Sequence, residues 1–175
     1  MGLEKVMSVQ RLVRIAIFAA IIFVQEFVLS FIPNVQLTQC LITVFYYSLG
    51  LVDTLIIIVI HVFLDNLTMG SFNLIYTPAM LIGWISLPLI LHLFKRNQNR
   101  FFSATIVALH SIIYCMLFAL ANALILEVPF LTYFIADIPF EVILIVNGFI
   151  TTLVFKDKLV HLLNRFNNHK SLQNI

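Results

Sequence analysis

The lysine and arginine residues of this chain occur in three short clusters, and the long segments between the clusters contain none. Residues 15–94 and 101–155 carry no basic side chain other than histidine. Multi-span membrane proteins concentrate lysine and arginine in their cytoplasmic loops. The pattern therefore predicts that the N-terminus, the middle connector and the C-terminus face the cytoplasm. The clusters are Lys5, Arg11 and Arg14; Lys95, Arg96 and Arg100; and Lys156, Lys158, Arg165 and Lys170.

Composition indicates the same class. Of the 175 residues, 62% are hydrophobic and only 10% are charged, with a mean hydropathy of +1.06. Such a chain lacks the polar surface that a soluble globular protein needs. We therefore predict an all-α integral membrane protein, folded as one domain over residues 1–175.

The lengths of the apolar segments predict six transmembrane helices with both termini cytoplasmic. Pro33 ends the first helix, Gly50 separates the second from the third, and Thr77-Pro78 is a typical helix start. From Lys156 the tail is first amphipathic and is expected to lie at the cytoplasmic interface. The predicted spans are residues 13–32, 37–49, 53–64, 79–94, 102–126 and 137–155.

Polar residues gather in the outer half of the predicted bundle. Glu26 lies four helical turns after Arg11, hence about 22 Å along the axis. Polar groups in hydrocarbon are costly unless they line a cavity or pair with one another, so an outward-facing polar pocket is expected. The alternative is that several of them only cap helix ends, as for Asp137 two residues before Pro139, or turn a loop, as for Asn73. The set comprises Gln25, Glu26, Gln36, Gln39, His61, Asp65, Asn66, Asn73, Tyr76, Asn122, Glu127, Asp137 and Glu141.

Catalytic motifs are missing from the sequence. The five glycines are too widely spaced for a phosphate-binding loop, so the chain is not expected to hydrolyse ATP by itself. No HExxH or GxSxG motif occurs. His61 and Asp65 share a helix face and could hold a metal, but a third ligand is not obvious, and a hydrogen-bonded pair is the alternative. We predict a protein that is not an enzyme and that has no cofactor and no metal.

The chain resembles the substrate-binding S components of energy-coupling factor (ECF) vitamin transporters. The resemblance covers the length, the six helices, the Ala16-Ile17-Phe18-Ala19-Ala20 stretch, which is similar to the AxxxA signature of that family, and the IPNVQLT segment at residues 32–38. It implies a vitamin or related micronutrient as substrate, bound from outside at a site gated by connecting loops. It also implies a multi-pass protein of a prokaryotic cell membrane.

The same resemblance implies how uptake is driven. Ala16 and Ala20 would dock on the transmembrane coupling subunit, which carries two ATP-binding subunits.

Several aromatic residues could stack on a planar ring of the substrate, namely Trp84, with Tyr76, Phe72 and Tyr133. The alternative is that they are aromatic residues of the lipid interface. Cobalamin is one candidate substrate, although it would need a wider mouth.

Two other classes remain open. The segment from Leu64 to Ser71, an aspartate followed by a Gly-Ser turn, is similar to the rod-shape protein MreD, a membrane scaffold that transports nothing. An intramembrane hydrolase using Glu26 or the His61/Asp65 pair would lack a recognisable nucleophile.

Overall fold

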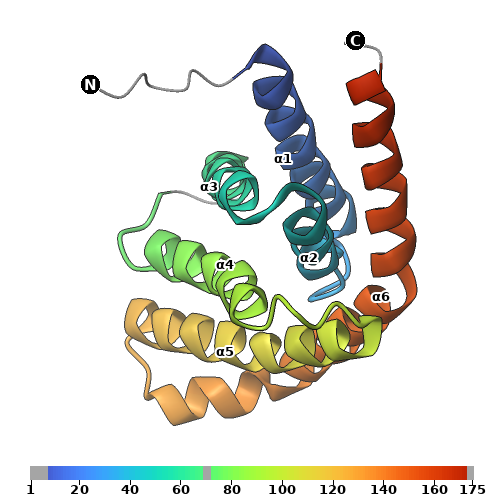
Figure 1. The fold of residues 1–175 in the computed structure, drawn as a ribbon. Coiled ribbons are helices and arrows are strands. Elements are labelled where there is room, and N and C mark those ends of the chain that lie inside the picture. The colour runs from blue at the N-terminus through green and yellow to red at the C-terminus, as the bar shows by residue number, and fades with distance from the viewer. Residues whose placement is uncertain (1–7, 69–71, 173–175) are drawn as a thin grey trace.

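The computed structural model describes residues 8–68 and 72–172, and within these ranges the chain is entirely helical (Figure 1). Five of the described helices are long and apolar enough to cross a membrane, and α2, with 12 residues, is shorter. The predicted class of multi-pass, all-α membrane protein is therefore confirmed. The helices are α1 (Val9–Leu29), α2 (Thr38–Leu49), α3 (Leu51–Thr68), α4 (Tyr76–Leu93), α5 (Arg100–Leu126) and α6 (Phe130–Leu172).

Local sequence explains several of the helix boundaries. The hydroxyl of Ser8 accepts a hydrogen bond from the Arg11 backbone at 3.3 Å and caps α1. The side chain of Asn99 does the same for α5, accepting from Phe101 N at 2.8 Å. Between α2 and α3 the chain reverses through Gly50 alone, at a φ of 86°, in the left-handed region that glycine tolerates. Caps of this kind satisfy backbone groups that the helix itself leaves unpaired.

The predicted start of α4 was wrong in its detail. Asn73, not Thr77, supplies the capping oxygen: its Oδ1 accepts from the backbone N–H groups of Ile75 and Tyr76 at 2.8 and 3.0 Å. The Thr77 hydroxyl instead donates to Asn66 Oδ1 at 2.7 Å and ties α4 to α3. An Asx turn that forms ahead of the helix thus takes precedence over a cap at the Thr-Pro step.

The loop between α3 and α4 and the helix α6 also differ from the prediction. Helix α3 continues to Thr68, so Asp65 is helical, not part of a loop. Helix α6 begins at Phe130, so Tyr133 and Asp137 lie inside it and Asp137 is not a helix cap. Pro129 accounts for this early start, since proline is favoured next to the first helical residue and its carbonyl accepts from Tyr133 N at 3.2 Å.

Helix α6 extends far beyond the predicted span end at Phe155. Its first part lies alongside α5, and its last part, drawn in red, turns away at a steep angle (Figure 1). Leu159, Val160 and Leu163 on the last part are half-buried and pack against the core. The predicted amphipathic tail is therefore a continuation of α6, held by one apolar face.

The core is built around α2. Eight of its residues between Thr38 and Tyr46 are buried, and it packs against α3, α4 and α6. Gln39 lies where α2 meets the α5–α6 pair: its side chain donates to Ser111 Oγ at 2.8 Å, and a Cβ on Gly148 would overlap its Oε1. A helix buried by protein on most sides does not have to match the thickness of the lipid.

One end of the bundle, here called the basic end, brings the three clusters of basic residues together with the α2–α3 turn. Asp53, in the first turn of α3, pairs with Arg11 at 2.5 Å and with Arg14 at 3.1 Å. The Nζ of Lys156 bonds to the carbonyl of Gln98 in the connector between α4 and α5. Lys5 lies outside the described residues.

Helix α2 links the remaining two clusters to this end. Near its last turn, Tyr47 lies 4.5 Å under Lys156 Nζ, and its hydroxyl is 3.2 Å from Ser103 Oγ at the start of α5. Residue 47 is followed within two turns by Asp53, the partner of both arginines. The predicted common location of the three clusters thus corresponds to one end of the folded chain.

Candidate functional site

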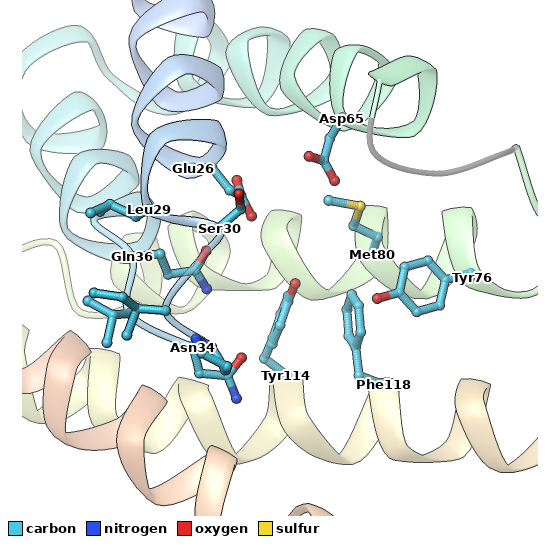
Figure 2. A pocket seen from close by; sticks show the side chains of 13 residues that line it. Glu26, Leu29, Ser30, Asn34, Gln36, Asp65, Tyr76, Met80, Tyr114 and Phe118 are labelled. Carbon is cyan, nitrogen blue, oxygen red and sulfur yellow. The ribbon is translucent and has the colours of Figure 1, made fainter.

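A pocket of about 250 Å³ lies at the opposite end of the bundle from the basic clusters. It forms between the last turns of α1 and α3, the first turns of α4, the second half of α5 and the α1–α2 loop (Figure 2). We call this the pocket end. The lining residues are Glu26, Leu29, Ser30, Ile32, Pro33, Asn34, Val35, Gln36, Asp65, Tyr76, Met80, Tyr114 and Phe118.

Glu26 is held in place from behind. Its Oε2 accepts from the Thr38 hydroxyl at 3.3 Å and lies 3.1 Å from His61 Nε2. The His61 pair is within ion-pair distance but lacks the alignment of a hydrogen bond. Thr38 is itself fixed, because Gln25 Nε2 donates to its hydroxyl at 2.7 Å. Thr38 and His61 are both fully buried, so Glu26 is backed by side chains of the core.

Asp65 lies one turn after His61 on α3, and its situation differs from that of Glu26. Its carboxylate forms no hydrogen bond or ion pair with any described residue, and its Oδ1 is shielded from solvent. A shielded carboxylate without a partner is costly. In Figure 2 it faces the same space as Glu26.

Aromatic rings form the wall below the two carboxylates. The Tyr114 and Phe118 rings stack with centroids 4.3 Å apart, and Tyr76 meets Phe118 edge-on at 4.8 Å. Trp84, fully buried, packs behind Tyr114 at 4.3 Å. The hydroxyl of Tyr114 points up toward the carboxylates (Figure 2).

A glycine on α4 allows this wall to form. A Cβ at Gly83 would come within 2.8 Å of the Tyr114 ring, closer than van der Waals contact permits. The Gly83 carbonyl is also 2.9 Å from His110 Nε2, which ties the same turn of α4 to α5. Close approach of the two helices therefore places Tyr114 at the pocket.

The loop between α1 and α2 closes one side of the pocket and is fastened to α6. Asn34, at a φ of 57°, donates its Nδ2 to the carbonyl of Phe140 at 2.8 Å. Asn147 Nδ2 donates to the carbonyl of Gln36 at 2.5 Å. Asparagine tolerates the left-handed backbone conformation better than most residues.

The structure places four of the predicted binding residues on the pocket, namely Glu26, Gln36, Asp65 and Tyr76. His61 and Trp84 form a layer behind it. Asn122 lies one turn beyond Phe118 on α5 and is half-buried. The two others are elsewhere: Gln39 bonds to Ser111 in the core, and Asn73 caps α4.

Several lining residues were not expected from the sequence. Tyr114 and Phe118 precede the predicted Asn122 at intervals of four, so all three lie along one face of α5, and this spacing was the available signal. Met80 lies one turn after Tyr76 on α4 in the same way. Asn34 and Ser30 line the pocket only because the α1–α2 loop folds over it, which no spacing could show.

The pocket lining is acidic in composition. Of the described residues, it includes two with carboxylate side chains and no lysine or arginine. The described part of the chain contains no group of three or more His, Cys, Asp or Glu side chains that could hold a metal ion. The arrangement therefore suits binding of a molecule by carboxylates, hydroxyls and aromatic rings.

Comparison with known proteins identifies no relative of this chain. No family model, curated protein or solved structure matches this chain.

The predicted docking residues Ala16 and Ala20 precede the pocket residue Glu26 on α1 and do not line the pocket. Ala16 and Ala20 are exposed, whereas Ala19 between them is fully buried against the core. The small-residue face of α1 is therefore not covered by the described part of the chain.

Proposed function

We propose that this chain is the substrate-binding membrane subunit of an ECF-type importer, which captures a vitamin or related micronutrient from outside a prokaryotic cell. The observation that carries the proposal is the pocket at the end of the bundle opposite to the basic clusters. Basic loops mark the cytoplasmic side of membrane proteins, so a pocket at the other end faces outward. A small, partly apolar pocket with a few convergent polar groups is typical of a ligand site.

The exposed alanines of α1 support the partner side of the proposal. Ala16 and Ala20 are one helical turn apart, and small residues at this spacing allow another helix to approach closely in lipid. We propose that the transmembrane coupling subunit docks there and brings two ATP-binding subunits. The chain is then a binding subunit with no catalytic activity of its own, and ATP hydrolysis belongs to its partners.

The scaffold alternative of the MreD type has weaker support. It rests on the segment from Leu64 to Ser71, of which residues 69–71 lie outside the described part of the chain. Asp65, the charged residue of that segment, lines the pocket. A membrane scaffold has no need for a pocket in which two carboxylates face aromatic rings.

The experiment that tests the proposal is co-purification with an ECF module. The chain is expressed with a coupling subunit and two ATP-binding subunits, and assembly and ATP-dependent uptake are measured for the unchanged chain and for the Ala16→Leu/Ala20→Leu double variant. We expect the double variant to lose both assembly and uptake, because the leucines fill the groove. The control is Ala136→Leu, which makes the same Ala-to-Leu substitution once, at an exposed position of α6. It should retain both assembly and uptake.

The identity of the bound molecule is tested separately. The chain is purified from cells grown in rich medium, and small molecules released from it are identified by mass spectrometry. We expect a micronutrient in stoichiometric amount, retained by the double variant, because the pocket and the alanines lie at different levels of α1. Normal assembly and uptake by the double variant would contradict the proposed docking face.

A further inference from the structure

We infer that the molecule bound in the pocket is a compact organic cation with an apolar body. The inference rests on the proposed function, because it names the class of substrate that the same site would take. It depends on the charge, the unpaired polar groups, the aromatic wall and the size of the pocket.

The composition of the lining disfavours an anionic ligand. Glu26 and Asp65 line the pocket from two different helices, and no lysine or arginine of the described residues shares the lining. His61 Nε2, behind them, lies 3.1 Å from Glu26 Oε2, and Asp65 accepts no hydrogen bond from the described residues. An added carboxylate or phosphate would meet like charges in a poorly solvated space, whereas a cation would be attracted by both carboxylates.

The unpaired groups of the pocket require hydrogen-bond donors from the ligand. Ionised carboxylates only accept hydrogen bonds, and Asp65 accepts none from the described residues. The Tyr114 hydroxyl points toward the carboxylates and can both donate and accept a hydrogen bond (Figure 2). An amino, amidino or protonated ring-nitrogen group would supply the missing donors, and its charge would shorten and strengthen the bonds.

The wall opposite the carboxylates is apolar, and its rings pack against one another. Tyr114 and Phe118 stack on each other with centroids 4.3 Å apart, and Tyr76 meets Phe118 edge-on. Trp84 packs against Tyr114 from behind, also at 4.3 Å. The wall therefore offers apolar surface to the body of a ligand, while the carboxylates attract its charge.

The pocket is small. Its volume of about 250 Å³ lies just below the range of roughly 300 to 1,000 Å³ in which drug-sized ligands are bound. A single ring with one charged substituent is therefore a better match than a large macrocycle such as a corrinoid.

The experiment compares three probes of nearly equal shape: benzamidinium, which is a cation, benzamide, which is neutral, and benzoate, which is an anion. Binding to the purified full-length chain in lipid nanodiscs is measured by calorimetry. We expect benzamidinium to bind about 10- to 100-fold more tightly than benzamide, which is the range for hydrogen bonds to a charged group. Benzoate should show no binding.

The variant Asp65→Asn keeps the shape of the side chain and removes one charge. We expect it to lower benzamidinium affinity at least about tenfold while benzamide affinity changes little. Glu127→Gln, an equal charge change at an exposed position away from the pocket lining, is the matched control and should bind benzamidinium normally. If Asp65→Asn does not fold, Glu26→Gln replaces it with the same expectation.

Three results would overturn the inference: no binding of benzamidinium, equal or tighter binding of benzoate, or an equal loss in Glu127→Gln. Binding of Ni²⁺ alone, abolished by Asp65→Asn, would also overturn it in favour of a metal site. None of these results affects assembly with an ECF module, so the proposed function would stand. Conversely, a cation-selective pocket in a chain that never assembles with such a module would leave this inference intact and refute the importer.

Discussion

The two ends of the bundle use acidic residues in opposite ways. At the basic end, Asp53 is 7% exposed in its side chain and is bound by two guanidinium groups, Arg11 and Arg14. At the pocket end, the lining that Glu26 and Asp65 share includes no lysine or arginine of the described residues. All three carboxylates lie in the first or last turn of a helix, so the difference lies in their partners.

The comparison shows how a buried charge can be assigned to structure or to binding. A carboxylate whose partners belong to its own chain is neutralised when the protein folds, and it joins α1 to α3 at the basic end. A half-buried carboxylate that accepts no hydrogen bond from the described residues remains open to donors and positive charge from a ligand.

The largest effect should come from the accessibility of the two ends in intact cells. Leu74→Cys, an exposed position in the α3–α4 loop beside the pocket end, should react fully with an impermeant thiol reagent. Gln98→Cys, in the connector at the basic end, should not react until the membrane is permeabilised. The reason is that cytoplasmic loops carry the basic residues. Labelling is read by the mass shift of the purified protein.

The unchanged chain is the background control for this measurement, because its two cysteines, Cys40 and Cys115, are buried. Labelling of Gln98→Cys alone would reverse the orientation of the chain and move the pocket to the inside. It would leave the contrast between the two ends in place but remove its link to uptake.

The next effect is on stability, and it should differ in sign between the two ends. Asp53→Asn leaves two arginines without their carboxylate and should lower the free energy of unfolding by about 2 kcal/mol, since both arginines are partly exposed. Asp65→Asn removes a half-buried charge that accepts no hydrogen bond from the described residues, and it should leave the stability unchanged or raise it by up to about 1 kcal/mol. Denaturant titration in detergent micelles measures both.

The affinity for benzamidinium should change in the opposite order. Asp65→Asn should lower it, whereas Asp53→Asn should bind about as tightly as the unchanged chain. A similar loss of stability in both variants would mean that Asp65 has a structural partner after all. The distinction between the two ends would then fail.

The smallest effect tests whether helix packing places the aromatic wall. Gly83→Ala puts a methyl group against the Tyr114 ring and should cost about 1 kcal/mol of stability, at the low end for overpacking because the ring can shift. Its shift should weaken binding of benzamidinium several-fold. Calorimetry and denaturant titration on the same preparation separate the two effects.

Gly148→Ala is the matched control, because its methyl group overlaps Gln39 and Val107 in the core, away from the pocket lining. It should destabilise the protein at least as much as Gly83→Ala and leave ligand affinity unchanged. If both variants weaken binding equally, the pocket responds to general stability and the role assigned to Gly83 is wrong.

The membrane class, the number of helices and most of their extents could be predicted from hydropathy and from the basic clusters. These are properties of segments, and lipid enforces them on any chain of this composition. The helix boundaries that were predicted wrongly depend on which of several nearby residues begins the helix. At the start of α4 the choice lies between Asn73 and Thr77, and at the start of α6 between Pro129 and Asp137.

Prediction of the pocket residues was uneven for a related reason. The sequence indicates which side chains are too polar for lipid, and so it singled out Glu26 and Asp65 together with Gln39 and Asn73. It does not indicate where each finds a partner. Gln39 hydrogen-bonds to Ser111, a residue 72 positions away, and Asn73 hydrogen-bonds to the backbone next to it. Neither residue therefore lines the pocket.

By itself, the sequence determined that this chain is a bundle of apolar helices and that its lysines and arginines form three clusters, because a charge or an apolar run keeps its preference for water or lipid in any fold. Only the tertiary structure decided which carboxylate is paired and which is open. Asp53 and Asp65 lie at opposite ends of the same helix, and the sequence does not show which partners either of them finds. Contacts between α1 and α3 bring two arginines to one of them, and contacts among α1, α3, α4 and α5 leave the other facing a pocket.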